Sequence, residues 1–315
     1  MHPASSVILF TTSSGLGYGL LFLLGIAVPT GLIPAERWLG LAAMGLALGA
    51  ISLGLLASTF HLGHPERAWR ALSQWRSSWL SREGVVAVMT YVPAGIFAIG
   101  WVIFETANDA WALAGLLAAL GALVTVVCTA MIYASLETIR QWHNRWLVPV
   151  YLAFALMTGA LWLSVLLHLF GPGVLWCDLL AAVSVLLAWG LKLVYWRAID
   201  GDTGPSTPES ATGLAAFGTV RLLDPPHSQE NYLLREMGFR IARKHADKLR
   251  RIALAVGFAA TLLLTVVALF ASGWPAASAA VLAALSGSLG TAVERWLFFA
   301  EAKHSVMLYY GDRAA

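Results

Sequence analysis

The sequence predicts an all-α polytopic membrane protein with about eight transmembrane helices and long cytoplasmic loops. Eight apolar blocks of roughly 20 residues run along the chain, and a helix of that length crosses the hydrocarbon core of a bilayer. Only 12% of the residues are charged and 59% are hydrophobic, against about 25% charged in an average soluble domain. Apolarity within each block is continuous, which excludes a β-barrel. We expect residues 1–315 to form a single integral membrane domain.

The predicted spans differ in composition as well as in spacing. They cover 7–27, 38–60, 84–104, 111–135, 147–169, 175–195, 251–273 and 275–293, with limits good to about three residues. The first span contains Gly15, Gly17 and Gly19, and the eighth is rich in Ala, Gly and Ser. Such small residues are typical of close helix packing in lipid. We leave open whether the eighth span continues through Arg295–Ala302.

Basic residues gather in alternate gaps, on the side that bears both termini, which we call side A. Its gaps are 61–83, 136–146, 196–250 and the tail from 294; the opposite side, side B, has only Arg37. Because Lys and Arg are enriched in cytoplasmic loops, we expect side A and both termini to lie in the cytoplasm. The same rule explains the pI of about 9.0 without any nucleic acid.

The longest cytoplasmic loop is predicted at 196–250. It begins with a strap, Asp200–Gly218, which is rich in Gly, Pro, Ser and Thr. A basic amphipathic helix is expected over Gln229–Arg250, with Leu233, Met237 and Ile241 on one face. This helix suits either the anionic leaflet or a soluble partner, and the sequence favours neither.

The stretch from His61 to Leu72 predicts a break after the second span. Gly63 and Pro65 stop the helix, and Glu66–Trp75 is expected to form a short interfacial helix. His61 then ends the second span, while Ser81 is expected to cap the third span and Glu83 to lie in its first turn. We therefore expect a His and a Glu to lie at the same depth in the membrane, near side A.

This pair suits quinone chemistry, because reduction of a quinone head group takes two electrons and two protons. Histidine, whose pKa is about 6.5, is a natural proton partner. We predict His61 and Glu83 as catalytic residues; the alternative is that His61 only caps its helix and Glu83 is a solvated acid. Tyr133 lies where its hydroxyl suits a quinone carbonyl, although an interfacial aromatic belt is the competing interpretation. The remaining candidate quinone contacts are His64, Arg67 and Arg82.

Other cofactors and other classes of protein fit less well. Cys128 and Cys177 lack metal-site spacing, so we expect no iron–sulfur cluster in this protein. Haem is not expected either, because His61 and His168 end spans on opposite sides. A secondary transporter, the alternative of another class, is expected to show broken helices or charges near the midplane. Here the charged residues crowd the side A ends, as interface anchors or as part of a partner-facing quinone pocket: Glu137, Lys192, Glu294 and Arg295.

Three segments resemble the membrane anchor subunits of dimethyl-sulfoxide-reductase-type complexes, which belong to the complex iron–sulfur molybdoenzymes. They are Ser58-Thr59-Phe60-His61-Leu62-Gly63-His64-Pro65-Glu66-Arg67-Ala68 with Leu80-Ser81-Arg82-Glu83, the opening His2-Pro3-Ala4 with Phe10-Thr11-Thr12, and the closing Glu294-Arg295-Trp296-Leu297-Phe298-Phe299. The resemblance covers most of the sequence. It implies eight helices, exchange of electrons between quinone and a four-cluster iron–sulfur subunit, and a molybdopterin catalytic subunit. It assigns quinol binding to His61, and it implies a location in the inner (cytoplasmic) membrane of a bacterium.

Within this family the orientation favours one branch. The large basic side is predicted to face the cytoplasm, and the segment Leu222-Leu223-Asp224-Pro225-Pro226-His227 resembles the anchors of cytoplasmically oriented sulfite dehydrogenase complexes. The resemblance therefore implies sulfite oxidation coupled to reduction of ubiquinone, with menaquinone as the other option. The alternative within the family is the anchor of a dimethyl sulfoxide reductase or a related quinol-oxidising reductase.

Overall fold

The computed structural model describes residues 3–60, 62, 64–171, 175–201, 206–224, 226–227, 229, 231–237 and 245–313. In these residues all regular secondary structure is helical. His61 lies outside the described residues, so its predicted position is not placed.

All eight predicted spans are confirmed as helices that are long and apolar enough to cross a membrane. Six are single helices: α1 (Ser5–Ala27), α2 (Arg37–Thr59), α3 (Trp79–Phe104), α4 (Asp109–Ala134), α5 (Leu147–Phe170) and α6 (Leu175–Asp200). The seventh joins α10 (Ala246–Ile252), a π-helical turn η3 (Ala253–Ala260) and α11 (Thr261–Phe270), and the eighth is α12 (Trp274–Ala300). The short elements are η1 (Pro65–Gln74), α7 (Pro208–Thr212), η2 (Ala215–Phe217), α8 (Tyr232–Met237) and η4 (Ser305–Tyr310).

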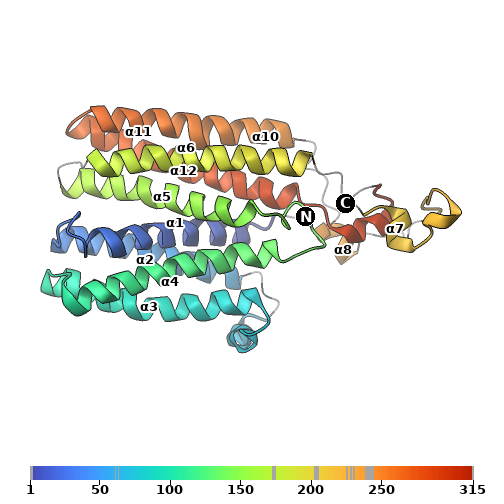
Figure 1. Ribbon diagram of the computed structural model, residues 1–315, viewed down its shortest axis with the longest axis horizontal. Coiled ribbons are helices and arrows are strands. Elements are labelled where there is room, and N and C mark those ends of the chain that lie inside the picture. Colours follow the sequence, from blue (N-terminus) through green and yellow to red (C-terminus); the bar gives the residue numbers. More distant parts are fainter. Residues whose placement is uncertain are drawn as a thin grey trace.

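The spans form one elongated bundle in which α1 and α5 lie at the centre. Figure 1 shows α3, α4 and α2 on one side of this pair and α6, α12 and α11 on the other. α1 packs on α2, α4 and α5, and α12 packs on α5 and α11. Glycines allow the central contacts: Gly19 of α1 faces the backbone of Ala155 on α5, and Gly159 faces the backbone of Gly19. Small residues at crossings let helix backbones approach closely in lipid.

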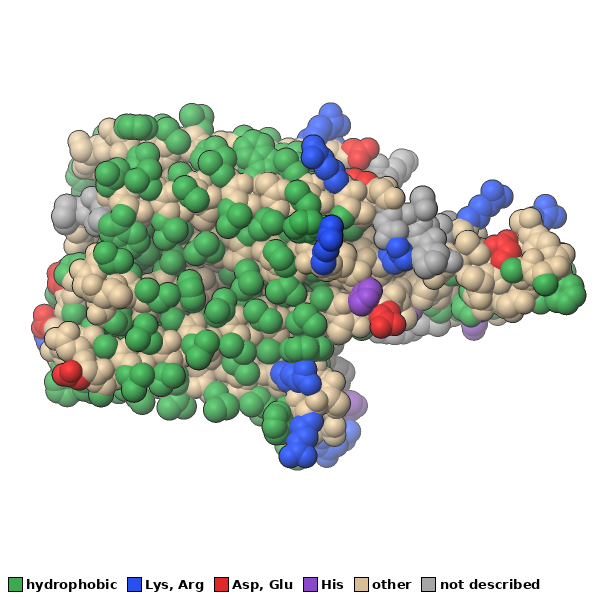
Figure 2. Space-filling model, in the orientation of Figure 1, with side chains coloured by type: hydrophobic (Ala, Val, Ile, Leu, Met, Phe, Trp, Pro, Cys, Tyr) green, Lys and Arg blue, Asp and Glu red, His purple; other side chains and the backbone are tan. Residues whose placement is uncertain are grey.

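The surface is divided as expected for a protein that spans a bilayer. Figure 2 shows hydrophobic side chains over the flanks of the bundle, and Lys and Arg side chains at the end that carries both termini. Arg37 lies at the opposite end, where it pairs with Glu105 at 2.7 Å. Large apolar side chains such as Leu41, Val88 and Leu113 are exposed along the spans. In a bilayer these side chains would face lipid.

The side A end departs from the sequence prediction in three places. α3 begins at Trp79, and its N-cap is Ser78, whose hydroxyl accepts from the Ser81 amide at 3.4 Å. Ser81 is therefore not the cap, and Glu83 sits one turn deeper than predicted. α6 continues to Asp200, so the first residues of the predicted 196–250 loop are helical. The predicted helix over 229–250 is represented by α8 and by α10, which opens the seventh span; residues 238–244 lie outside the described part.

Candidate functional site

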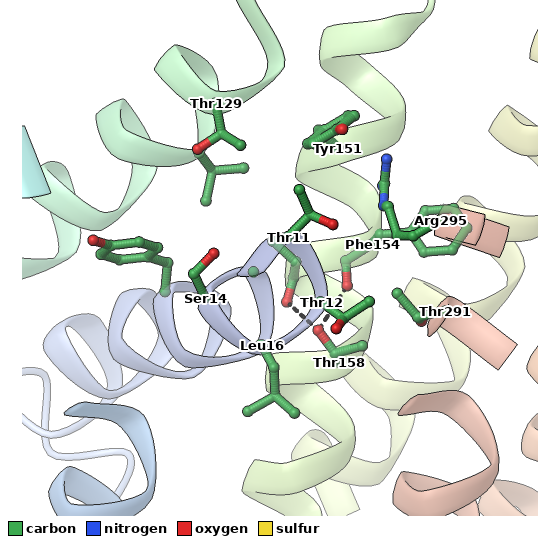
Figure 3. Close-up of a pocket in the computed structure, with 14 residues that line it drawn as sticks. Thr11, Thr12, Ser14, Leu16, Thr129, Tyr151, Phe154, Thr158, Thr291 and Arg295 are labelled. Carbon is green, nitrogen blue, oxygen red and sulfur yellow. Dashed lines mark hydrogen bonds between the residues drawn. The ribbon is translucent and has the colours of Figure 1, made fainter. Parts of the chain in front are cut away.

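A polar pocket lies at the side A end of the bundle, among α1, α4, α5 and α12. The space between its lining atoms is about 360 Å³, a figure that includes volume open to solvent. Figure 3 shows that the lining side chains come from all four helices, with Thr129 on α4 and Arg295 on α12 at different sides of α1. The polar lining includes Thr11, Ser14, Thr129, Tyr151, Thr158 and Arg295, and Phe154, Val126 and Leu16 supply apolar walls.

Most hydroxyls in this lining are anchored to their own helices. Ser14 Oγ donates to the Phe10 carbonyl at 2.6 Å, Thr158 Oγ1 to the Phe154 carbonyl at 2.8 Å, and Thr11 Oγ1 to the Val7 carbonyl at 3.0 Å. A helical Ser or Thr commonly satisfies its donor in this way. Each oxygen can still accept a hydrogen bond, so these residues offer acceptors to a ligand.

Glu83 stands directly behind the pocket. Its side chain is 4% exposed, and its Oε1 accepts a hydrogen bond from the hydroxyl of Thr129, which lines the pocket. The same hydroxyl lies 3.0 Å from the Thr125 carbonyl oxygen. Glu83 is therefore not a solvated first-turn acid. This position makes Glu83 a candidate functional residue, because ionisable residues inside a membrane bundle are costly and rare.

Tyr133 lies in an aromatic cluster beside the pocket. Its side chain is 8% exposed and packs on Trp142, Phe298 and Tyr151, with ring centroids 5.1, 5.4 and 6.0 Å away. This burial rules out the lipid-facing aromatic belt. Tyr133 is absent from the pocket lining, but it supports Tyr151, which is part of it.

The other three candidates lie on or beside η1, away from the pocket lining. His64 Nδ1 is 3.0 Å from Glu66 Oε1, and Arg67 Nε is 3.7 Å from the same oxygen. Arg82 donates to the carbonyls of Trp75 and Arg76 at 2.9 and 2.7 Å, which ties the end of η1 to the start of α3. The structure therefore brings none of these three side chains into the described pocket.

A buried charged cluster reaches the pocket from its other side. Lys192 Nζ lies 2.5 Å from Glu294 Oε1, and Arg295 Nε lies 3.3 Å from Glu294 Oε2. The three side chains are at most 2% exposed, so the interpretation as interface anchors is wrong for them. The sequence gives a partial indication of this cluster, because an ionisable residue within a transmembrane segment is a candidate functional residue. The sequence left open whether the eighth span continues past 293, and α12 continues to Ala300.

The comparisons with known proteins agree with the helical architecture. Residues 1–301 match the family described as DMSO reductase anchor subunit (DmsC). The chain belongs to this family. It is a membrane anchor subunit, and its relatives are subunits of oxidoreductase complexes.

This anchor subunit is similar to two known proteins in sequence and to one solved structure in fold. It is 32% identical to a sulfite dehydrogenase subunit from Allochromatium vinosum, over 98% of this chain and 99% of that protein. It is 28% identical to a subunit of the anaerobic dimethyl sulfoxide reductase of Escherichia coli, over 57% of this chain and 63% of that protein. The fold is similar to that in the bd oxidase from Geobacillus thermodenitrificans, with a TM-score of 0.52 at 14% identity, covering 100% of this chain and 92% of that one.

Proposed function

We propose that this anchor subunit reacts with quinone in the side A pocket and passes electrons between an iron–sulfur subunit and the quinone pool. The observation that carries the proposal is the pocket itself: polar side chains and an apolar wall at one end of the bundle, backed by the buried carboxyl of Glu83. The anchor family and the two oxidoreductase relatives support it.

The chemistry of the lining residues suits a quinone head group. The ring needs apolar surfaces, which Phe154, Val126 and Leu16 supply, and its two oxygens need hydrogen-bond donors. Donors come from side chains of α4, α5 and α12, including Thr129, Tyr151 and Arg295. When bound, the quinone accepts two electrons and two protons.

Glu83 and Thr129 are the groups that handle protons in this proposal. The Thr129 hydroxyl lies between the pocket and the Glu83 carboxyl, to which it donates when that carboxyl is ionised. When Glu83 is protonated the hydrogen bond reverses: Glu83 donates to the Thr129 oxygen, and the Thr129 hydroxyl can donate its proton into the pocket. Glu83 is then reprotonated from side A. We assign His61, at the end of the second span, to the same route. A positioned acid–base group of this kind typically contributes about 10²–10⁴-fold to a rate.

Side A is also the side from which electrons arrive. A cluster docked on side B would lie about 30 Å of hydrocarbon away from the pocket, so we place the four-cluster iron–sulfur subunit, with the molybdopterin subunit behind it, on side A. The basic loops favour a cytoplasmic location for that side. The full-length match to a sulfite dehydrogenase subunit favours sulfite oxidation with ubiquinone as acceptor. An anchor for reduction of dimethyl sulfoxide is the second candidate, favoured by the shorter match.

The test uses membranes that contain the whole complex. Sulfite-dependent reduction of ubiquinone should be measured beside reduction of a soluble artificial acceptor by the same membranes. Glu83→Gln should lower the quinone-linked rate by about 10²-fold or more and leave the soluble-acceptor rate unchanged, and His61→Ala should do the same. The matched control is Glu105→Gln, an exposed glutamate at the side B end.

Three outcomes separate the possibilities. Loss of both rates in Glu83→Gln would point to failed assembly, which the amount of assembled complex in the membrane reports directly. Wild-type quinone-linked rates in Glu83→Gln would contradict the proton role of this residue. Membranes that oxidise quinol with dimethyl sulfoxide, and do not oxidise sulfite, would decide for the second candidate.

A further inference from the structure

We propose that Arg295 is the residue that binds one ring oxygen of the quinone, and that Glu294 and Lys192 position its guanidinium for this contact. The inference rests on the proposed quinone function and names the ligand-binding residue of that pocket. It follows from three observations on the buried cluster: how the guanidinium is packed, which of its donors is left over, and the charge balance around it.

The guanidinium of Arg295 is held by aromatic faces. Its central carbon lies 3.8 Å from the ring centroid of Tyr151 and 5.3 and 5.6 Å from those of Phe154 and Phe298. Arginine packs in this way because its planar cation is attracted to the face of a ring. Packing against the faces leaves the N–H edge of the guanidinium for hydrogen bonding. The N–H groups on this edge are therefore available both to Glu294 and to a ligand in the pocket.

One donor group on this edge has no hydrogen-bond partner among the described residues. Arg295 Nε lies 3.3 Å from Glu294 Oε2, but Nη1 is buried and makes no hydrogen bond to any described residue. Buried donors are almost always satisfied, so an orphan of this kind needs an explanation. Arg295 lines the pocket, and a ligand oxygen is the partner that the geometry accommodates.

The charges around Arg295 leave its guanidinium available to a ligand oxygen. Lys192 and Arg295 share one carboxylate, Glu294. The neighbouring Arg250 binds both Glu301, at 2.6 Å, and Asp200, so these six groups balance at three positive and three negative charges. Arg295 therefore has only a shared carboxylate as its ionic partner, and its guanidinium can stabilise a ring oxygen that gains electron density when electrons arrive.

The two charged features define opposite ends of the pocket. Thr129 with Glu83 behind it comes from α4 and α3, whereas Arg295 comes from α12, and both Thr129 and Arg295 line the cavity. A para-quinone carries its two oxygens at opposite ends of the ring. Arg295 can therefore bind one oxygen while the Thr129 hydroxyl reaches the other. In this arrangement Arg295 fixes and polarises the ring, and protons enter at the Glu83 end.

Binding, measured apart from turnover, tests the proposal. Membranes holding the assembled complex are titrated with a fluorescent heptyl-hydroxyquinoline N-oxide, a quinol analogue, and its emission gives the dissociation constant. Arg295→Gln should raise that constant about tenfold or more, the usual weight of a hydrogen bond from a charged donor. Arg295→Lys, which keeps the charge and loses the planar fork, should raise it by a smaller factor. Arg37→Gln, an exposed arginine at the other end, is the control and should bind as the wild type does.

The role of Lys192 is tested by rescue. Lys192→Met should weaken binding of the analogue, and Lys192→Arg should restore it at an equal thermal midpoint of the solubilised complex. Arg295→Lys remains informative if Arg295→Gln does not assemble. Unchanged binding in assembled Arg295→Lys and Arg295→Gln complexes would overturn the proposal. If the wild-type complex shows no saturable binding at all, the quinone function itself is wrong; if the wild type binds and the Arg295 variants bind equally well, only the assignment of Arg295 fails.

Discussion

Gly19 is the position where the smallest change should disturb both the bundle and the pocket. A methyl group added there would overlap the carbonyl oxygen of Ala155 and lie 2.5 Å from its carbonyl carbon. Carbon atoms in ordinary contact are about 3.5–4.0 Å apart, so α1 and α5 would have to separate by about 1 Å. Such overpacking costs about 1–3 kcal/mol, and more where the obstacle is backbone.

The experiment compares Gly19→Ala with Gly45→Ala. A methyl group at Gly45 meets nothing within 4 Å, so Gly45→Ala should stay within about 1 kcal/mol of the wild type. Unfolding in mixed micelles of rising denaturing-detergent content measures both variants. Gly19→Ala should unfold earlier by the stated cost and should also bind quinol analogue more weakly, because α1 and α5 supply Thr11, Ser14, Tyr151 and Thr158 to the pocket. Equal unfolding of the two variants would refute the close backbone contact between α1 and α5.

Two further predictions concern the side A surface. His304 caps η4, where its Nδ1 accepts from the Val306 amide at 3.0 Å, and burial lowers its pKa. The fold therefore favours the neutral imidazole. The stability that this cap contributes is present above about pH 6.5 and is lost as the pH falls through the lowered pKa. Hydrogen-exchange protection in 305–310 should therefore drop on acidification in the wild type, and the drop should be absent in His304→Asn, whose cap does not titrate. For topology, cysteines introduced in 206–218 should resist a membrane-impermeant label in intact cells and react after lysis; ready labelling of intact cells would reverse the orientation and remove the case for sulfite.

The spans were predictable from sequence because each depends on local composition. A run of about 20 apolar residues needs no partner to be identified, and the eight spans appear in the structure within a few residues of the predicted limits, apart from the extended ends of α3, α6, α10 and α12. The extension of α3 has a local reason: Ser78 rather than Ser81 caps it, and both are serines in a plausible position. To choose between the two serines, one must know how the third helix packs against its neighbours.

The sequence predicted the level in the membrane at which the candidate site lies, but not most of the residues that form it. Glu83 was identified because it lies beside a helix start on side A, and that is a local signal. For Arg295 the sequence left two interpretations open, an interface anchor or part of a quinone pocket, because its burial depends on Glu294 and on Lys192 from α6, far away in the sequence. A charged residue at the end of an apolar run indicates that the span ends there. Only a known ion-pair partner on another helix would indicate that the residue is buried instead. The hydroxyl lining was missed for a similar reason, since Thr and Ser on α1, α4 and α5 become a site only when the three helices meet.

The pairing of Lys192 with Glu294 also bears on how the protein enters the membrane. The two residues are about a hundred positions apart, and at about 5–20 residues per second α12 leaves the ribosome several seconds after α6. During this interval α6 carries a lysine without its carboxylate. A lysine at the centre of a span costs about 2.5–3.5 kcal/mol to insert, but near a helix end its long aliphatic stem lets the ammonium reach the aqueous interface. Lys192 lies in the last third of α6, toward side A. The ammonium can therefore stay at the side A surface and enter the bundle when α12 inserts, so that closure of the pocket becomes the final step of membrane insertion.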